Sequence, residues 1–162
     1  MAVLAAMTML LCLVLTGCSS MSDEEDTVER VKVGDHLPSF TVDVSDGSSH
    51  GSVFSSDKLT GETVIVFFNT SCEDCQRDLP LLNQYYLQHQ HDGFQMIAIS
   101  REEGNASIAK FWKENNLTIP YSAQKDRRVY NLFATSIIPR IYFCTKEGIV
   151  TRIDVEKFNL YL

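Results

Sequence analysis

Basic residues are scarce in this sequence of 162 residues. Lys and Arg together number 14 against 21 Asp and Glu, which gives a formal net charge of −7 at pH 7. Nucleic-acid binding relies on a basic surface that neutralises phosphates, so we expect no nucleic-acid partner. Five cysteines are also too few for a disulfide-built scaffold at this length. The remaining composition, 44% hydrophobic and 22% charged, is typical of one globular domain.

No charged residue occurs before Asp23, and residues 2–16 form an almost uninterrupted apolar run. The run is shorter than the roughly 20 residues of a membrane-spanning helix and has the length of the apolar region of a secretory signal peptide. It lacks the Lys or Arg that usually precedes such a region. The run ends in the letters LTGC, which resemble the bacterial lipoprotein signal. The resemblance implies that residues 1–17 are cleaved off and that Cys18 carries a lipid anchor.

Residues 18–30 carry five acidic residues against the single base Arg30. Such a short polar stretch cannot bury enough apolar surface to fold alone, so we interpret it as a tether between lipid and domain. The acidic run that begins at Ser22 also resembles tags that direct some Gram-negative lipoproteins to the cell surface. We therefore expect a domain over residues 31–162, located in the periplasm or at the cell surface of a bacterial envelope.

The domain shows no internal repeat and no linker rich in Gly or Pro. Its apolar segments predict strands that alternate with helices. We expect a hairpin over residues 40–54, strands at 64–68, 94–100, 141–144 and 149–155, and helices at 72–89, 105–115 and 126–133. This order predicts an α/β fold, a three-layer sandwich with a mixed central sheet.

The sequence Cys72-Glu73-Asp74-Cys75 follows the buried strand and opens the first helix. The free N–H groups of a helix start stabilise a thiolate. Residues three apart lie on one side of a helical turn, so the two sulfurs can form a redox-active disulfide. We expect Cys72, at the tip, to exchange with substrate and Cys75 to resolve the mixed disulfide.

Cysteine pairs at this spacing also occur in zinc sites, which need four ligands. The other candidate ligands after the pair, Cys144, His89 and His91, do not form a second pair with metal-ligand spacing. We therefore expect no metal and no other cofactor. Cys144 is predicted to be a buried structural thiol.

Three features around the cysteine pair resemble the thioredoxin fold. The pair lies between a strand and a helix, Pro80 lies where that helix would kink, and Ile138-Pro139 precedes the strand at 141–144. The resemblance implies that Pro139 is a cis-proline whose loop packs against the redox pair and binds extended substrate backbone.

The closer resemblance is to the TlpA/ResA-like disulfide reductases of the bacterial envelope, over roughly residues 33–155. The opening VGDHLPSFTV resembles the N-terminal hairpin of that family, and the 67 residues from Cys72 to Pro139 leave room for its inserted strand–helix element. Asp78 takes the position where members often have a Glu, which implies a proton relay between the thiols.

The sequence also departs from that family. Ser71 stands where Trp usually precedes the first cysteine, which leaves Cys72 more exposed. Arg140 follows the predicted cis-proline where Thr is common, and it either places a positive charge near the disulfide or points into solvent. The acids Glu73 and Asp74 oppose a thiolate and so favour the disulfide, which predicts a reductant.

The sequence therefore predicts a membrane-anchored thiol:disulfide oxidoreductase that reduces disulfides of envelope proteins and is recharged by a membrane electron donor. Apocytochrome c, as in cytochrome c maturation, and mispaired secreted proteins are both candidate substrates. A peroxiredoxin-like thiol peroxidase is an alternative, although Ile65 and Asn69 stand where that family has Pro and Thr or Ser. A copper carrier of this fold is disfavoured because no His follows His91. A thioredoxin-fold binding module without redox turnover stays open, and its function would survive replacement of Cys72 by Ser.

Overall fold

The computed structural model describes residues 28–45, 51–90 and 93–159. The predicted signal peptide, the lipid-anchor residue Cys18 and most of the predicted tether lie outside the described residues. Within the described part no helix is long and apolar enough to cross a membrane.

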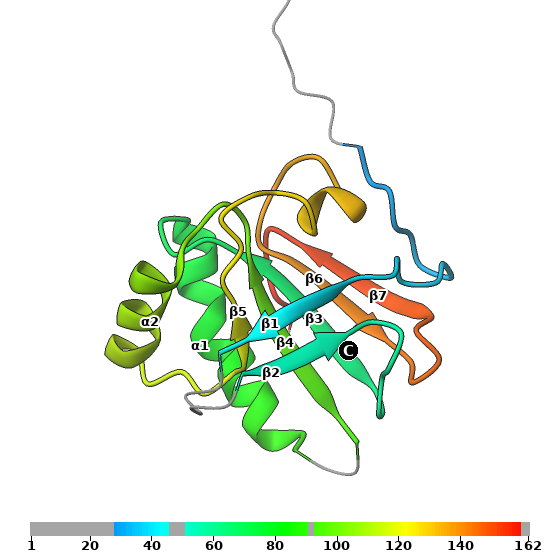
Figure 1. The fold of residues 1–162 in the computed structure, drawn as a ribbon, viewed down its shortest axis with the longest axis horizontal. Coiled ribbons are helices and arrows are strands. Elements are labelled where there is room, and N and C mark those ends of the chain that lie inside the picture. Colours follow the sequence, from blue (N-terminus) through cyan, green and yellow to red (C-terminus); the bar gives the residue numbers. More distant parts are fainter. Residues whose placement is uncertain (1–27, 46–50, 91–92, 160–162) are drawn as a thin grey trace, which may run out of the picture.

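Five strands form the central sheet, in the order β5-β4-β3-β6-β7 (Figure 1). These strands are β3 (Thr63–Phe68), β4 (Gln95–Ser100), β5 (Tyr121–Ser122), β6 (Arg140–Cys144) and β7 (Val150–Val155). β3 pairs in parallel with β4 and antiparallel with β6, so the sheet is mixed as predicted. All six residues of β3 are buried because this central strand is covered on both faces.

The other elements are the hairpin strands β1 (Thr41–Val44) and β2 (Ser52–Ser55), the helices α1 (Glu73–Gln88) and α2 (Asn105–Glu114), and the short 3₁₀ helix η1 (Tyr130–Leu132). β1 and β2 are antiparallel and form the predicted N-terminal hairpin. α1 is followed by β4, α2 and β5, a strand–helix–strand run at the edge of the sheet. The sequence predicted an inserted strand–helix element between Cys72 and Pro139, which is this part of the chain.

Aromatic contacts show which elements cover each face of the sheet. Phe67 and Phe68 point to opposite faces because side chains alternate along a strand. The Phe68 ring lies 5.0 Å from Trp112 of α2, measured between ring centroids. The Phe67 ring lies 4.8 Å from Phe133, which lies 5.7 Å from Phe40 next to the hairpin. The helices therefore form one outer layer and the hairpin and η1 region the other, with the hairpin in front in Figure 1.

The helix predicted over residues 126–133 is wrong in extent, because only the single turn η1 forms there. The backbone N–H of Arg128 donates to the Asp126 side chain at 3.0 Å, and the Arg127 guanidinium donates to the Thr135 carbonyl. These side-chain bonds flank a tighter turn, in which the N–H groups of Leu132 and Phe133 bond three residues back, to the carbonyls of Val129 and Tyr130. The apolar spacing in this segment reflects the burial of Tyr130 and Phe133. A single turn is sufficient to bury both side chains.

Candidate active site

Cys72 is the N-cap residue of α1, at the end of the short loop that follows β3. Its backbone is extended, with φ −82° and ψ 119°, and its Sγ accepts a hydrogen bond from the Cys75 backbone N–H at 3.3 Å. A sulfur thus occupies the position where Ser or Asp usually satisfies the first N–H groups of a helix. The same groups and the helix dipole stabilise negative charge on this sulfur.

The two cysteines differ sharply in exposure. Cys72 is partly exposed, Cys75 is 0% exposed, and both are free thiols, so the structure represents the dithiol form. Burial, and next the hydrogen bond with Cys72, raise the pKa of Cys75 far above that of an ordinary thiol. The backbone N–H of Asn69 and the charge of Arg101 lower the Cys75 pKa, but they do not outweigh burial. Cys75 is therefore a protonated thiol at neutral pH, which fits the predicted role of resolving cysteine.

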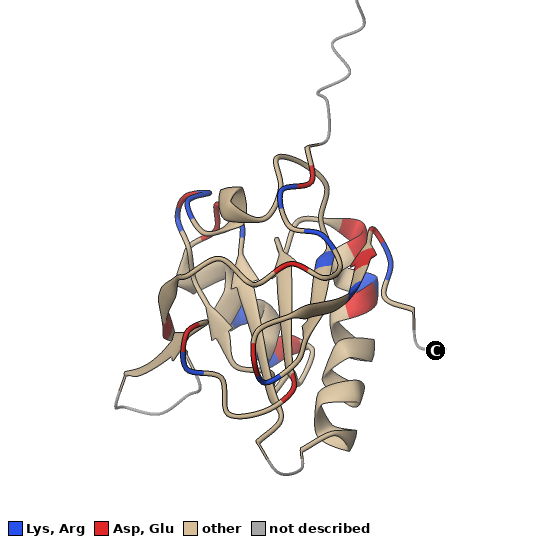
Figure 2. Cartoon of the chain, turned by 90° about the vertical axis from the view of Figure 1, so that its right-hand side faces the viewer, with Lys and Arg blue, Asp and Glu red and all other residues tan. Residues whose placement is uncertain are grey.

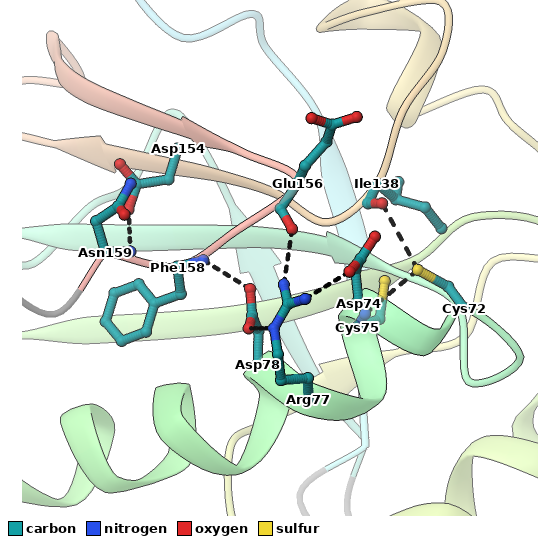
Figure 3. A network of polar contacts seen from close by, with 10 residues as sticks. All are labelled: Cys72, Asp74, Cys75, Arg77, Asp78, Ile138, Asp154, Glu156, Phe158 and Asn159. Atoms are coloured by element: carbon teal, nitrogen blue, oxygen red, sulfur yellow. Dashed lines mark hydrogen bonds and ion pairs between the residues drawn. The ribbon is translucent and has the colours of Figure 1, made fainter.

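The loop before β6 packs against the exposed sulfur. The peptide bond between Ile138 and Pro139 is cis, and the Cys72 thiol donates to the Ile138 carbonyl at 3.6 Å (Figure 3). The Tyr130 hydroxyl donates to the carbonyls of Ser136 and Ile137, the latter at 2.8 Å. The fold thus brings two segments 66 residues apart, the CxxC turn and the cis-Pro loop, to one site.

Arg140, the residue after the cis-proline, does not point into solvent, which was one of the two orientations expected for it. The side chain is 2% exposed, its Nη1 lies 3.2 Å from Glu29 Oε1, and its Nε donates to the Ser136 carbonyl at 3.1 Å. Its guanidinium therefore forms an ion pair with the N-terminal segment and a hydrogen bond with the cis-Pro loop.

Glu29 belongs to residues 28–30, which were predicted to be part of the tether. In the structure this segment pairs with the chain just before the cis-Pro loop: Glu29 bridges to Ala134, and the Thr135 N–H donates to the Val28 carbonyl at 3.1 Å. The last residues of the predicted tether thus contact the chain that leads into the cis-Pro loop.

Asp78, the predicted proton relay, is 1% exposed and makes two short contacts. Its Oδ1 accepts from Arg77 Nε at 2.7 Å, and its Oδ2 accepts from the Phe158 backbone N–H at 2.6 Å. Figure 3 shows the carboxylate pointing toward Arg77 and Phe158, one turn of α1 beyond Cys75. These contacts use one lone pair on each carboxylate oxygen, and the relay through Asp78 stays a prediction.

Several residues at the site were not among those predicted from the sequence. The Glu103 carboxylate accepts from both the Thr70 backbone N–H, at 2.7 Å, and the Thr70 hydroxyl, and so holds the loop before Cys72. The Arg101 guanidinium lies 5.3 Å from the Tyr130 ring centroid. These two residues follow β4 as the cysteine pair follows β3. The carboxyl ends of parallel strands share one edge, and that position was the available signal.

The residues at the two positions where peroxiredoxins have Pro and Thr or Ser have structural roles in this protein. Ile65 is a fully buried residue of β3, and the Asn69 side chain donates to the Arg101 carbonyl at 3.0 Å. Both residues support the fold next to the cysteine pair.

Charge at the site is concentrated in the first two turns of α1, as Figure 2 shows. Arg77 Nη1 lies 2.5 Å from Asp74 Oδ1, which offsets part of the negative charge next to Cys72. Cys144 lies apart from this pair as a free thiol that is 3% exposed in β6, and burial raises its pKa to about 12.

Comparison with known proteins places these features in a family. The model of the AhpC/TSA family matches residues 33–153. A thiol-disulfide oxidoreductase ResA from Bacillus cereus is 24% identical over 121 residues, which cover 74% of this chain and 68% of that protein. ResA from Geobacillus thermodenitrificans is 28% identical over 127 residues, which cover 76% of this chain and 69% of that protein.

Solved structures show the same fold. A thiol:disulfide interchange protein of the thioredoxin family from Chlorobium tepidum matches with a TM-score of 0.66 at 21% identity, covering 79% of this chain and 90% of that chain. The thioredoxin domain of a thiol-disulfide oxidoreductase from Bacteroides vulgatus matches with a TM-score of 0.62 at 20% identity, covering 76% and 89%. The thioredoxin-like fold and the resemblance to ResA are therefore confirmed. The chain belongs to the AhpC/TSA family and is a thioredoxin-fold thiol–disulfide oxidoreductase.

Proposed function

We propose that this protein is a disulfide reductase of the bacterial envelope, anchored to a membrane by lipid on Cys18. Its substrates are disulfides of envelope proteins, with apocytochrome c and mispaired secreted proteins as the two candidates. The observation that carries the proposal is the asymmetry of the pair: Cys72 is accessible at a helix N-terminus, and the buried Cys75 is held as a thiol behind it.

The asymmetry gives the two cysteines an order of reaction. The Cys72 thiol loses its proton and attacks one sulfur of a substrate disulfide, whose S–S bond breaks, and the leaving substrate sulfur takes up a proton. Cys75 then loses its proton and attacks Cys72 Sγ. The mixed disulfide breaks, the second substrate sulfur leaves as a thiol, and a Cys72–Cys75 disulfide remains. The substrate has gained two electrons, which a membrane electron donor must replace because the compartment is oxidising.

Two features support the reducing direction. Burial disfavours a thiolate on Cys75, and Glu73 places a negative charge next to Cys72. Both effects act in the direction opposite to the stabilisation of a Cys72 thiolate by the helix N-terminus. A pair whose thiolates are less stabilised releases electrons more readily than strongly oxidising members of the fold, whose reduced form is stabilised. Asp74 contributes less negative charge next to Cys72 than the sequence suggests, because its carboxylate is paired with Arg77.

The reduction potential of the Cys72–Cys75 couple tests this direction. We would equilibrate the full-length protein with thiol redox buffers and quantify the disulfide, with C75S as the control that cannot form it. The proposal expects a potential near that of thioredoxin, about −270 mV. A value between about −180 and −120 mV would identify an oxidase or isomerase instead. If no intramolecular disulfide forms, redox turnover by this pair is refuted.

The anchor is tested separately in bacterial cells. Cys18→Ser removes the only sulfur to which the predicted lipid attaches, so the protein is expected to leave the membrane fraction and lose incorporated labelled palmitate. Cys12→Ser, in the predicted signal peptide, is the matched control and should change neither property. Unaltered membrane association and labelling of the Cys18 variant would contradict anchoring at this residue.

A further inference from the structure

The chain after β7 lies between the redox helix and the cis-Pro loop. The Glu156 backbone N–H donates to the Pro139 carbonyl at 2.9 Å, and the Glu156 carbonyl accepts from Arg77 Nη2 at 2.9 Å (Figure 3). One peptide segment therefore contacts both halves of the active site. Two residues further on, the Phe158 N–H donates to Asp78, which fixes the same segment to α1 a second time.

Arg77 is the centre of this arrangement. Its three nitrogens each meet a different acceptor: Nε meets Asp78 Oδ1 at 2.7 Å, Nη1 meets Asp74 Oδ1 at 2.5 Å, and Nη2 meets the Glu156 carbonyl. The two carboxylates come from the same helix, so they set the orientation of the guanidinium plane. The third donor then points at the C-terminal segment, an arrangement that requires a planar fork and that a lysine ammonium cannot reproduce.

The backbone of Glu156 links Arg77 to the cis-Pro loop. It lies in the left-handed region, with φ +63°, so the chain changes direction immediately after β7. Its N–H and its carbonyl are used by partners from two different elements, the cis-Pro loop and α1. Glu156 therefore connects the two elements through a single residue, next to the Arg140–Val155 pair of the sheet.

We propose that Arg77 is a positioning residue for thiol–disulfide exchange, which holds the cis-Pro loop over Cys72 through the backbone of Glu156. The inference rests on the exchange reaction at Cys72. Because the Ile138 carbonyl lies 3.6 Å from Cys72 Sγ, a polypeptide disulfide that reaches this sulfur must contact the loop. A small aromatic disulfide does not need to do so. Asp78, in this arrangement, orients Arg77 and the C-terminal segment.

The test compares two substrates on the reduced full-length protein. R77Q is expected to lower the second-order rate with a disulfide-bonded peptide about 10-fold, since misplacement of groups around a reacting centre is costly. The rate with Ellman's reagent, a small aromatic disulfide, should fall less, because loss of the charge that offsets Asp74 acts on Cys72 with either reagent, whereas loss of position affects only the peptide. R77K keeps the charge but loses the fork, so it should behave like R77Q toward the peptide.

Two controls separate position from charge and stability. R128Q removes an arginine that pairs with another aspartate, Asp126. The Arg128 side chain is 85% exposed, and the variant should leave both rates unchanged. V42A removes buried volume from the hairpin and lowers stability without touching the C-terminal segment. It should not change the ratio of the two rates.

The outcomes are distinct. Equal peptide rates for R77Q and wild type, or an equal loss with both reagents, would overturn the positioning role. If R77K retains the wild-type peptide rate, the positive charge at residue 77 is sufficient and the planar guanidinium is not needed. That result would also overturn the positioning role. If R77Q does not fold, the comparison of R77K with wild type carries the same test. Failure of the wild-type protein to react with the peptide would count against the exchange activity and not against Arg77.

Discussion

Cys72 and Cys75 share one turn of α1 and yet have different chemistry. The difference comes from depth: Cys72 caps the helix at the surface, whereas Cys75 lies among the core residues of the sheet. In the dithiol form the same Cys75 supplies both its backbone N–H and its side chain to contacts with Cys72. Because Cys72 is accessible, its sulfur reacts with substrate first. Because Cys75 is buried, it stays protonated until the mixed disulfide has formed.

Alkylation of the reduced protein should distinguish these thiols. A raised pKa keeps a thiol protonated, and hence unreactive, at every pH well below that pKa. Burial raises the pKa of Cys75 strongly and that of Cys144 to about 12, so both are thiols at pH 7.5. Brief treatment with iodoacetamide at that pH should modify Cys72 and leave the other two at least about 10-fold less labelled, as read by tandem mass spectrometry.

Unfolding provides the control for this experiment. In concentrated urea the three cysteines are equally solvated and should be labelled to similar extents. Comparable labelling of Cys75 and Cys72 in the folded protein would contradict the asymmetry from which the order of attack is derived.

At the scale of elements, the cis-Pro loop is held from two sides. The segment at residues 28–31 supports it from the N-terminal side through backbone pairing and through the ion pair between Glu29 and Arg140. The chain after β7 supports it from the C-terminal side through Glu156. The loop contributes no regular element of its own, so its geometry depends on these neighbours.

The N-terminal support makes a prediction about stability. Glu29→Gln leaves the buried Arg140 guanidinium without its carboxylate partner, which is destabilising. Because the Glu29 side chain is 40% exposed and water screens the pair, we expect a loss of about 1 kcal/mol in the free energy of unfolding. Urea unfolding of the reduced protein measures it.

The matched control for Glu29 is Glu114→Gln. Glu114 is paired with Lys110 at 3.9 Å on the surface of α2, with side chains 61% and 74% exposed. Exposed pairs of this kind contribute little, so the variant should unfold at nearly the wild-type urea concentration. Equal midpoints for both variants would show that the pair with Arg140 adds no stability.

At the scale of the whole molecule, the active site lies where distant parts of the chain meet. The turn after β3 provides the cysteines, the loop before β6 provides the cis-proline, and the segments at the beginning and end of the described chain hold that loop. The three layers bring these segments together, because β3 and β6 are neighbours in the sheet while the hairpin and helices cover its faces. If Cys18 carries a lipid, the support at residues 28–31 connects the anchor to the active-site loop through a short stretch of chain.

Much of this architecture is determined by local sequence. The apolar run at 64–68 predicts a buried strand, alternation around a turn predicts the hairpin, and the cysteine pair after a strand predicts a helix with a sulfur at its start. These features follow from periodicity and from the chemistry of a helix terminus, which involve residues close together in the chain. For that reason the elements, their order and Cys72 and Cys75 were predictable.

The tertiary structure alone decided two long-range contacts of arginines at the site. Arg140 pairs with Glu29 across 111 residues, and Arg77 meets Glu156 across 79, and neither pairing leaves a local pattern. The extent of the helix expected at 126–133 also differs in the structure, where the N–H groups of Leu132 and Phe133 bond three residues back and only the turn η1 forms. The physical reason is that a buried or half-buried charge takes whichever complementary group the packed layers bring near it, and sequence separation does not limit that choice.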